Sequence, residues 1–246
     1  MIIFLRSLAF NAWFFGVTFV MGLYGVLLRG RGTDRVLAHA QRWAALVLAG
    51  VRPLAGIEIV VLGRENLPQG GAALIASQHQ SAFDTVLWLQ LVPRAAYVFK
   101  AELARIPLFG AMLESGGQIP VGRTAGAGSL RETLRAVDRA VADRRQIVVF
   151  PEGTRVAYGE RAALQPGIAL IARRARLPIV PIATNSGLAW PRRAFLKRPG
   201  RVFVVATPAL APESDQTALL AALRAAWDDG EAVIQRTLDA EKPSHD

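Results

Sequence analysis

After Gly56 the chain alternates short apolar runs, typical of strands, with stretches of helical periodicity, and this alternation constrains the fold most. Such chains build sheets covered by helices, because each apolar sheet face and each apolar helix stripe buries the other. The sequence therefore predicts an α/β domain over residues 56–246. The expected strands are Ile57–Leu62, Ala72–Ser77, Ala95–Phe99, Gln146–Phe150, Ile179–Ala183 and Arg201–Ala206, and the expected helices are Ala82–Leu91, Ser129–Asp143, Gly167–Ala175 and Gln216–Ala240.

A long uncharged segment precedes this domain. From Ser7 to Leu28 there is no charged side chain, and arginines stand on both sides of the run. As a helix it is long enough to cross a hydrocarbon layer of about 30 Å. The excess of arginine after the run favours a cytoplasmic position for the domain that follows. We therefore expect residues 1–55 to form a membrane anchor. The flanking arginines are Arg6, Arg29, Arg31 and Arg35.

Other readings of the N-terminal segment remain open. Ala38-His39-Ala40 has the small-x-small pattern of a signal-peptide cleavage site, although the apolar run is longer than the usual apolar region of such peptides. A buried or re-entrant hairpin is a further possibility. A second helix is expected from Asp34 to about Val51, with His39 on its arginine-bearing side. Its apolar part is too short to span, so an interfacial or a core-packing position is expected.

The net charge and the amino-acid composition limit the kinds of molecule that this chain is expected to bind. The 29 basic and 19 acidic residues give a net charge of +10, which favours anionic partners such as nucleic acid, acidic lipid or a phosphorylated substrate. No nucleic-acid-binding signature is present, so nucleic acid is disfavoured. The absence of cysteine excludes disulfides, thiolate nucleophiles and cysteine metal sites.

The first chemical motif is the stretch HQSAFD, in which His79 and Asp84 are five residues apart. Two residues at this spacing within a regular helix point about 140° away from each other. They meet if His79 precedes the helix and Asp84 lies in its first turn, where the carboxylate would fix the imidazole tautomer. Ser81 and Asp84 also fit a capping box, in which the carboxylate only satisfies backbone N–H groups. Spacing alone leaves both interpretations open.

The second motif, FPEGTR, follows an apolar run that we interpret as a buried strand. Polar residues at the carboxyl ends of such strands commonly line a ligand crevice. Gly153 permits a close approach of the backbone, and Arg155 can bind a phosphate with two parallel hydrogen bonds. An ordinary tight turn with a solvated arginine is the alternative.

The ordered blocks HQSAFD, KAEL, GGQIPVGR, FPEGTR and LPIVPIAT resemble the glycerophospholipid acyltransferase family, most closely the bacterial 1-acyl-sn-glycerol-3-phosphate acyltransferases. The resemblance runs from about Ala72 to Ala183. It implies a mixed, mostly parallel β-sheet flanked by helices, with an N-terminal membrane-associated helical hairpin. It also implies an O-acyltransferase of phospholipid biosynthesis at the cytoplasmic side of the bacterial inner membrane.

Matching the motifs position by position implies individual roles. His79 would be the general base and Asp84 the carboxylate that orients it. Leu177–Thr184 would form a strand that shapes the acyl or acceptor pocket. Residues implied at the acceptor phosphate are Lys100, Arg123, Glu152, Gly153, Thr154 and Arg155. The chain departs from the common pattern at Gln78, Gly122 and Val156, which weakens any inference about the phosphorylated acceptor.

The reaction implied is transfer of an acyl group from acyl-CoA or acyl-ACP to the sn-2 hydroxyl of 1-acyl-sn-glycerol-3-phosphate, giving phosphatidic acid without a cofactor or metal. Glycerol 3-phosphate, another lysophospholipid or a lyso-aminolipid are alternative acceptors. A non-catalytic lipid-binding protein is the alternative from another class. The segment Trp190–Arg198 mixes aromatic, apolar and basic residues, which suits an anionic membrane surface, or else an ordinary solvated loop.

Overall fold

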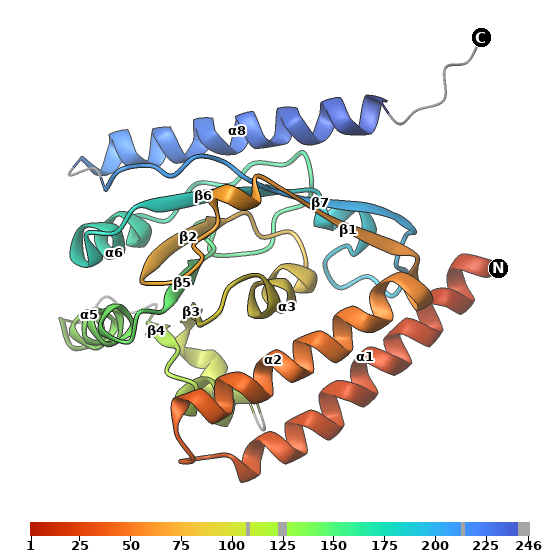
Figure 1. Ribbon diagram of the computed structural model, residues 1–246, viewed down its shortest axis with the longest axis horizontal. Helices are drawn as coiled ribbons and strands as arrows, with labels where there is room; N and C mark the ends of the chain where they lie inside the picture. The colour runs from red at the N-terminus through yellow and green to blue at the C-terminus, as the bar shows by residue number, and fades with distance from the viewer. Residues whose placement is uncertain (107–108, 123–126, 213–214, 241–246) are drawn as a thin grey trace.

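The computed structural model describes residues 1–106, 109–122, 127–212 and 215–240, and within these residues the chain builds one seven-stranded sheet (Figure 1). The strand order is β1-β7-β6-β2-β5-β3-β4. The strands from β6 to β4 in this order are parallel, whereas β7 pairs antiparallel with β6 and parallel with β1. The mixed, mostly parallel sheet is therefore confirmed. Its strands are β1 (Ile57–Leu62), β2 (Ala73–Ser77), β3 (Ala95–Lys100), β4 (Ile119–Val121), β5 (Gln146–Val149), β6 (Ile179–Thr184) and β7 (Gly200–Ala206).

All the expected strands form, but β4 was not predicted. It is three residues long and contains Pro120, which lacks the N–H group that a central strand needs. Its position at the edge of the sheet explains why the proline is tolerated there. The short helices α4 and α7 were also missed, because neither is long enough to show a periodic pattern. Their bounds are Phe109–Ser115 and Ser186–Ala189.

Helices cover both faces of the sheet, as Figure 1 shows for α8 on one side and the hairpin of α1 and α2 on the other. Successive strand residues point to opposite faces, so Leu74 packs with the helices α5, α6 and α8 while Ile75 packs with α1, α2 and α3. Both residues are fully buried. The longer helices are α1 (Ile2–Leu27), α2 (Thr33–Gly50), α3 (Ala82–Leu91), α5 (Ala127–Ala142), α6 (Gly167–Ala175) and α8 (Gln216–Ala240).

The N-terminal segment forms a helical hairpin, in which α1 lies against α2. The indole of Trp43 donates a hydrogen bond to Thr18 Oγ1 at 3.0 Å, and that of Trp13 donates to the carbonyl of Leu46 at 2.9 Å. Within the described residues, α1 is the one helix long and apolar enough to cross a membrane. Its outer face exposes many large apolar side chains, among them Phe4, Leu8, Phe15, Phe19, Val20 and Leu23.

His39 lies on the arginine-bearing side of α2, as its helical spacing from Arg35 and Arg42 predicted, but unlike these arginines it is not exposed. Its side chain is buried, and its Nε2 lies 2.8 Å from the carbonyl of Met21 in α1. The ring also packs against Tyr24. The sequence pattern of α2 alone does not show that a carbonyl oxygen of α1 lies opposite the imidazole.

The segment Trp190–Arg198 is fastened to α1 and is therefore not simply a solvated loop. Ser7 Oγ accepts a hydrogen bond from the amide of Lys197 at 2.9 Å, and Asn11 donates to the carbonyl of Phe195 at 2.9 Å. Phe10 packs edge-on against Trp190 with ring centroids 4.9 Å apart. Burial lowers the pKa of Lys197 to about 8. Exposed residues of this segment include Arg192, Arg193, Phe195, Leu196 and Arg198.

Candidate active site

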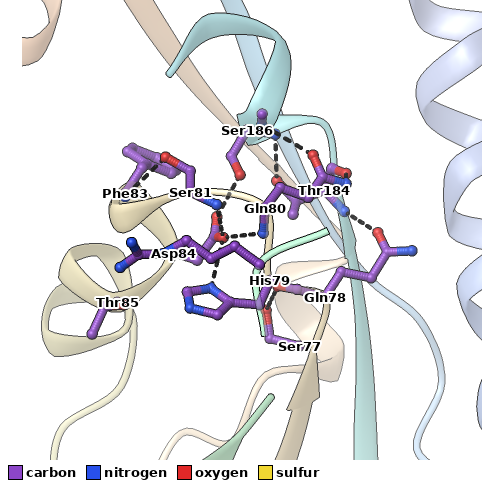
Figure 2. Close-up of polar contacts among 12 residues, drawn as sticks. Ser77, Gln78, His79, Gln80, Ser81, Phe83, Asp84, Thr85, Thr184 and Ser186 are labelled. Carbon is purple, nitrogen blue, oxygen red and sulfur yellow. Dashed lines mark hydrogen bonds and ion pairs between the residues drawn. The ribbon is translucent and has the colours of Figure 1, made fainter. Parts of the chain in front are cut away.

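His79 lies between the end of β2 and the start of α3, as the sequence predicted (Figure 2). Ser81 is the N-cap of α3, and its hydroxyl accepts a hydrogen bond from the amide of Phe83 at 3.1 Å. Asp84 is the third residue of the helix, so its side chain points back toward the N-terminal end. The imidazole and the carboxylate are therefore brought together by the first turn of α3.

The capping box and the His–Asp pair both exist, because one carboxylate oxygen serves both. Asp84 Oδ2 accepts hydrogen bonds from the amides of Gln80 and Ser81 at 2.7 and 2.8 Å. The same oxygen lies 3.2 Å from His79 Nδ1. The two interpretations that spacing left open are thus compatible. With Nδ1 directed at the carboxylate, Nε2 is the ring nitrogen left for a substrate.

The ring of His79 is also held from one side. It stacks on Phe150, with ring centroids 4.1 Å apart and an interplanar angle of 22°. Phe150 in turn stacks on Tyr97 at 6.5 Å. The hydroxyl of Tyr97 donates to the carbonyl of Thr85 at 2.6 Å, and burial raises the pKa of this phenol well above its usual value. Carboxylate and aromatic contacts together restrict the orientation of the imidazole.

The FPEGTR turn is bonded directly to the HQSAFD turn through the backbone of His79. Glu152 Oε2 accepts a hydrogen bond from the amide of His79 at 2.7 Å, and the amide of Val156 donates to the carbonyl of His79 at 2.8 Å. Glu152 is buried, and this burial raises its pKa to about 7. Its carboxylate thus contacts the protein backbone, whereas the family resemblance placed it at the acceptor phosphate.

Arg155 lies on the FPEGTR turn, close enough to Asp84 for the two charges to interact. Its side chain is half-buried, and its Nε is buried without a hydrogen-bond partner. Burial lowers the pKa of the guanidinium, and the charge of Asp84 partly opposes that shift. Gly153 has a φ of +65°, which favours glycine, and the neighbouring Thr154 is exposed.

The remaining residues predicted at the acceptor phosphate are Lys100 and Arg123. Lys100 is the last residue of β3 and is exposed. Because β2, β5 and β3 are parallel neighbours, it lies at the same edge of the sheet as His79 but two strands away. Arg123 lies outside the described residues. The structure therefore joins His79, Asp84 and Glu152 directly, places Arg155 close enough to Asp84 for their charges to interact, and places Lys100 on the rim of the same edge.

Sequence reasoning missed the part of the site that follows β6. Ser186 Oγ donates a hydrogen bond to Asp84 Oδ1 at 2.5 Å, and the side chain of Gln80 donates to the carbonyl of Thr184 at 2.6 Å. Gln78 Oε1 accepts from the amide of Thr184 at 3.0 Å. A usable signal existed, because polar residues end both β2 and β6 and parallel strands end at one edge. The pairing of β2 with β6 was the missing information.

Comparisons with known proteins identify the family of this chain. The family model described as acyltransferase matches residues 58–185. The chain belongs to the acyltransferase family. A 1-acyl-sn-glycerol-3-phosphate acyltransferase of Pseudomonas aeruginosa is 32% identical over 183 residues, which is 74% of this chain and 71% of that protein. The region matched by the family model contains the HQSAFD and FPEGTR turns and the strand β6.

More distant members of the acyltransferase family are also similar. The human 1-acyl-sn-glycerol-3-phosphate acyltransferase alpha is 25% identical over 74% of this chain and 63% of its own length. A 1-acyl-sn-glycerol-3-phosphate acyltransferase of Cocos nucifera is 31% identical over 54% of this chain and 44% of its own length. This chain thus spans less than two thirds of these two relatives.

The crystal structure of a 1-acyl-sn-glycerophosphate acyltransferase from Thermotoga maritima superposes with a TM-score of 0.74 at 23% identity. The match covers 94% of this chain and 96% of that one. At this identity the match shows a shared fold. The fold of this acyltransferase therefore includes the N-terminal helices as well as the sheet.

Proposed function

We propose that this acyltransferase moves a fatty acyl group from a thioester to the sn-2 hydroxyl of 1-acyl-sn-glycerol-3-phosphate, giving phosphatidic acid. The observation that carries the proposal is the contact of 3.2 Å between His79 Nδ1 and Asp84 Oδ2, with Arg155 on the adjacent turn. The names of the similar proteins supply the acceptor. Base, carboxylate and cation are the groups that such a transfer needs.

In this mechanism His79 Nε2 accepts the proton of the acceptor hydroxyl as its oxygen attacks the thioester carbonyl. The new C–O bond forms, the C–S bond breaks, and the departing thiolate takes the proton from the imidazolium. Asp84 stabilises the imidazolium while the proton resides on the ring. General-base catalysis of this kind contributes roughly 10²- to 10⁴-fold to the rate.

Arg155 would bind the phosphate of the acceptor. A guanidinium with a buried and unpartnered Nε has hydrogen-bonding capacity left for a ligand, and an arginine fits a phosphate with two parallel bonds. Lys100 and Arg123 are proposed as further phosphate contacts. Glu152 is proposed as a positioning residue for His79, because a buried carboxylate next to a phosphate would repel it.

We further propose that the hairpin of α1 and α2 holds the enzyme at an anionic membrane surface. The acceptor is amphiphilic and resides in the bilayer, whereas a CoA or acyl carrier protein thioester is water-soluble. The helix α1 is bonded to the domain through Ser7, near its N-terminal end, and to α2 through the carbonyl of Met21. These contacts favour a hairpin that lies in the membrane surface over a lone spanning helix. The cytoplasmic side of a bacterial inner membrane is the proposed location.

The decisive experiment measures thioester consumption by the purified protein with lysophosphatidate and either acyl-CoA or acyl-ACP. We expect turnover with the wild type and a loss of roughly 10²- to 10⁴-fold in His79→Ala. Thermal melting and vesicle flotation of the variant serve as controls for folding and membrane binding. Full activity in His79→Ala would eliminate the proposed base.

The same assay, offered several acceptors, tests the substrate. Mass spectrometry of the products would show phosphatidic acid as the main product if the proposal is right. A preference for glycerol 3-phosphate, another lysophospholipid or a lyso-aminolipid would replace the proposed acceptor while keeping the mechanism. A folded, membrane-bound wild type that consumes no thioester would support a non-catalytic lipid-binding protein.

A further inference from the structure

We propose that Ser186 is a positioning residue for the His79–Asp84 pair, and this inference rests on the proposed acyl transfer. Its hydroxyl donates a hydrogen bond of 2.5 Å to Asp84 Oδ1, the carboxylate oxygen that does not face the imidazole. Figure 2 shows this contact on the far side of the carboxylate from the ring. Ser186 thereby fixes the rotation of the carboxylate and keeps Oδ2 directed at His79.

The two oxygens of Asp84 differ in their partners. Oδ2 faces His79 Nδ1 and two backbone amides of the capping box. Among the residues that the structure describes, the donor to Oδ1 is the hydroxyl of Ser186. Asp84 is 3% exposed and Ser186 is fully buried. A buried carboxylate oxygen without a donor is costly, so loss of this hydroxyl would destabilise the observed orientation.

Ser186 is itself held firmly, which a positioning role requires. Its amide donates to Thr184 Oγ1 at 3.1 Å, and its carbonyl accepts from the amide of Trp190 at 2.9 Å. The preceding Asn185 bridges to β7, because its Oδ1 accepts from the amide of Phe203 at 2.7 Å. The serine thus sits on a rigid turn at the end of β6.

This turn also supports the HQSAFD turn at a second point. The amide of Gly187 donates to Gln80 Oε1 at 3.0 Å, and Gln80 Nε2 donates to the carbonyl of Thr184 at 2.6 Å. These bonds align the two turns, but they do not reach the dyad. The hydrogen bond from the hydroxyl of Ser186 is the contact that connects this turn to the carboxylate of Asp84.

A purely positioning role has a kinetic signature. Because Ser186 is fully buried, it cannot touch either substrate, so its removal should leave both KM values unchanged. The orientation of Asp84 matters most when the imidazolium forms, so the loss should appear in kcat. A hydrogen bond to a charged group corresponds to a change in kcat of roughly 10- to 100-fold.

The experiment compares Ser186→Ala and Ser186→Cys with Ser77→Ala as the matched control. Ser77 is 2% exposed and lies at the end of β2, and among the described residues its hydroxyl donates to the carbonyl of Gln78. We expect a 10- to 100-fold lower kcat in Ser186→Ala at unchanged KM, and an intermediate loss in Ser186→Cys, whose thiol is a weaker donor. Ser77→Ala should keep wild-type kinetics. Thermal melting identifies the variants that fold.

The outcomes separate this inference from the proposed function. An active wild type, an inactive His79→Ala and a folded Ser186→Ala with kcat within about twofold of wild type would overturn the role of Ser186 alone. If Ser186→Ala does not fold, wild-type kcat in the isosteric Ser186→Cys would overturn it equally. A wild type without turnover would instead count against the acyl transfer itself. Raised KM values with normal kcat would assign Ser186 to substrate binding.

Discussion

Asp84 and Arg155 lie on adjacent turns of one site, yet the protein uses their hydrogen-bonding capacity very differently. The carboxylate of Asp84 accepts bonds from two amides and a hydroxyl and also contacts the imidazole. The guanidinium of Arg155 has no hydrogen bond or ion pair to any residue that the structure describes, and its Nε is buried without a partner. In the proposed mechanism the base would therefore be oriented before any substrate arrives, whereas a ligand would complete the contacts of Arg155.

Under the proposed function, this difference assigns catalysis to the first motif and acceptor binding to the second. Orientation of an acid–base pair benefits from rigid protein contacts, because any reorganisation during the reaction raises the barrier. A phosphate-binding arginine benefits from free donors, because donors already bonded to protein would have to exchange partners. Changes at Asp84 should therefore affect the rate constant, and changes at Arg155 should affect acceptor binding.

The largest expected effect is that of Asp84→Asn. The amide keeps an oxygen that can accept the capping hydrogen bonds, but it lacks the charge that stabilises an imidazolium. We expect kcat to fall roughly 10²- to 10⁴-fold with little change in KM for the acceptor. Steady-state kinetics at several acceptor concentrations measure this. A large rise in KM at normal kcat would reverse the division proposed between the two motifs.

Arg155→Met should mainly weaken binding of the acceptor. Loss of charge-assisted hydrogen bonds to a phosphate should raise KM for lysophosphatidate roughly 10- to 100-fold and leave KM for the thioester unchanged. Arg155→Lys should restore part of the affinity, because an ammonium keeps the charge without the fork geometry. Arg174→Met is the matched control, since Arg174 is exposed and pairs with Asp138 on α5. Equal effects of the two methionine variants would remove Arg155 from the acceptor site.

Glu152→Gln should change how stability depends on pH. Burial raises the pKa of Glu152 to about 7 from its ordinary 4.5, so the folded protein retains a proton that the unfolded chain releases. The contribution of this group to stability is complete below pH 4.5 and is lost as the pH rises through 7, a change of about 3 kcal/mol.

Urea denaturation at pH 4.5 and pH 8 measures this effect. The wild type should lose more stability between these pH values than Glu152→Gln does, because glutamine does not titrate. Glu132→Gln, on the exposed side of α5, should behave like the wild type. Identical pH profiles for the wild type and Glu152→Gln would show that burial does not perturb this carboxyl.

The smallest expected effect is on membrane binding. The double variant Arg193→Ser/Arg198→Ser removes two exposed charges beside α1 and should weaken binding to anionic vesicles about fivefold per residue, from about 1 kcal/mol each. Binding to neutral vesicles should be unchanged. Arg135→Ser/Arg139→Ser removes the same charge from α5, on the opposite face of the sheet, and should have no effect on either vesicle. Binding is measured by vesicle flotation. If binding to anionic vesicles weakens equally in both double variants, net charge alone determines it.

The sequence predicted which helices and strands form better than it predicted which of them lie next to each other. Strong local patterns located β2 and α3 and placed His79 at the junction between them. Ser186 was missed because its role depends on the pairing of β2 with β6, which are separated by about a hundred residues. The contact between Glu152 and the amide of His79 was missed for the same reason, since no local pattern shows that these two turns meet.

The packing of Trp190 would be affected in any variant that lacks the first helix. Its indole packs on Phe10 and Phe14 of the first helix, while its amide closes the turn that carries Ser186. Deleting residues 1–30 to obtain a more tractable fragment would strip the indole of both aromatic partners. Weak catalysis by such a fragment would then result from the lost packing of Trp190, and not from the absence of a bilayer.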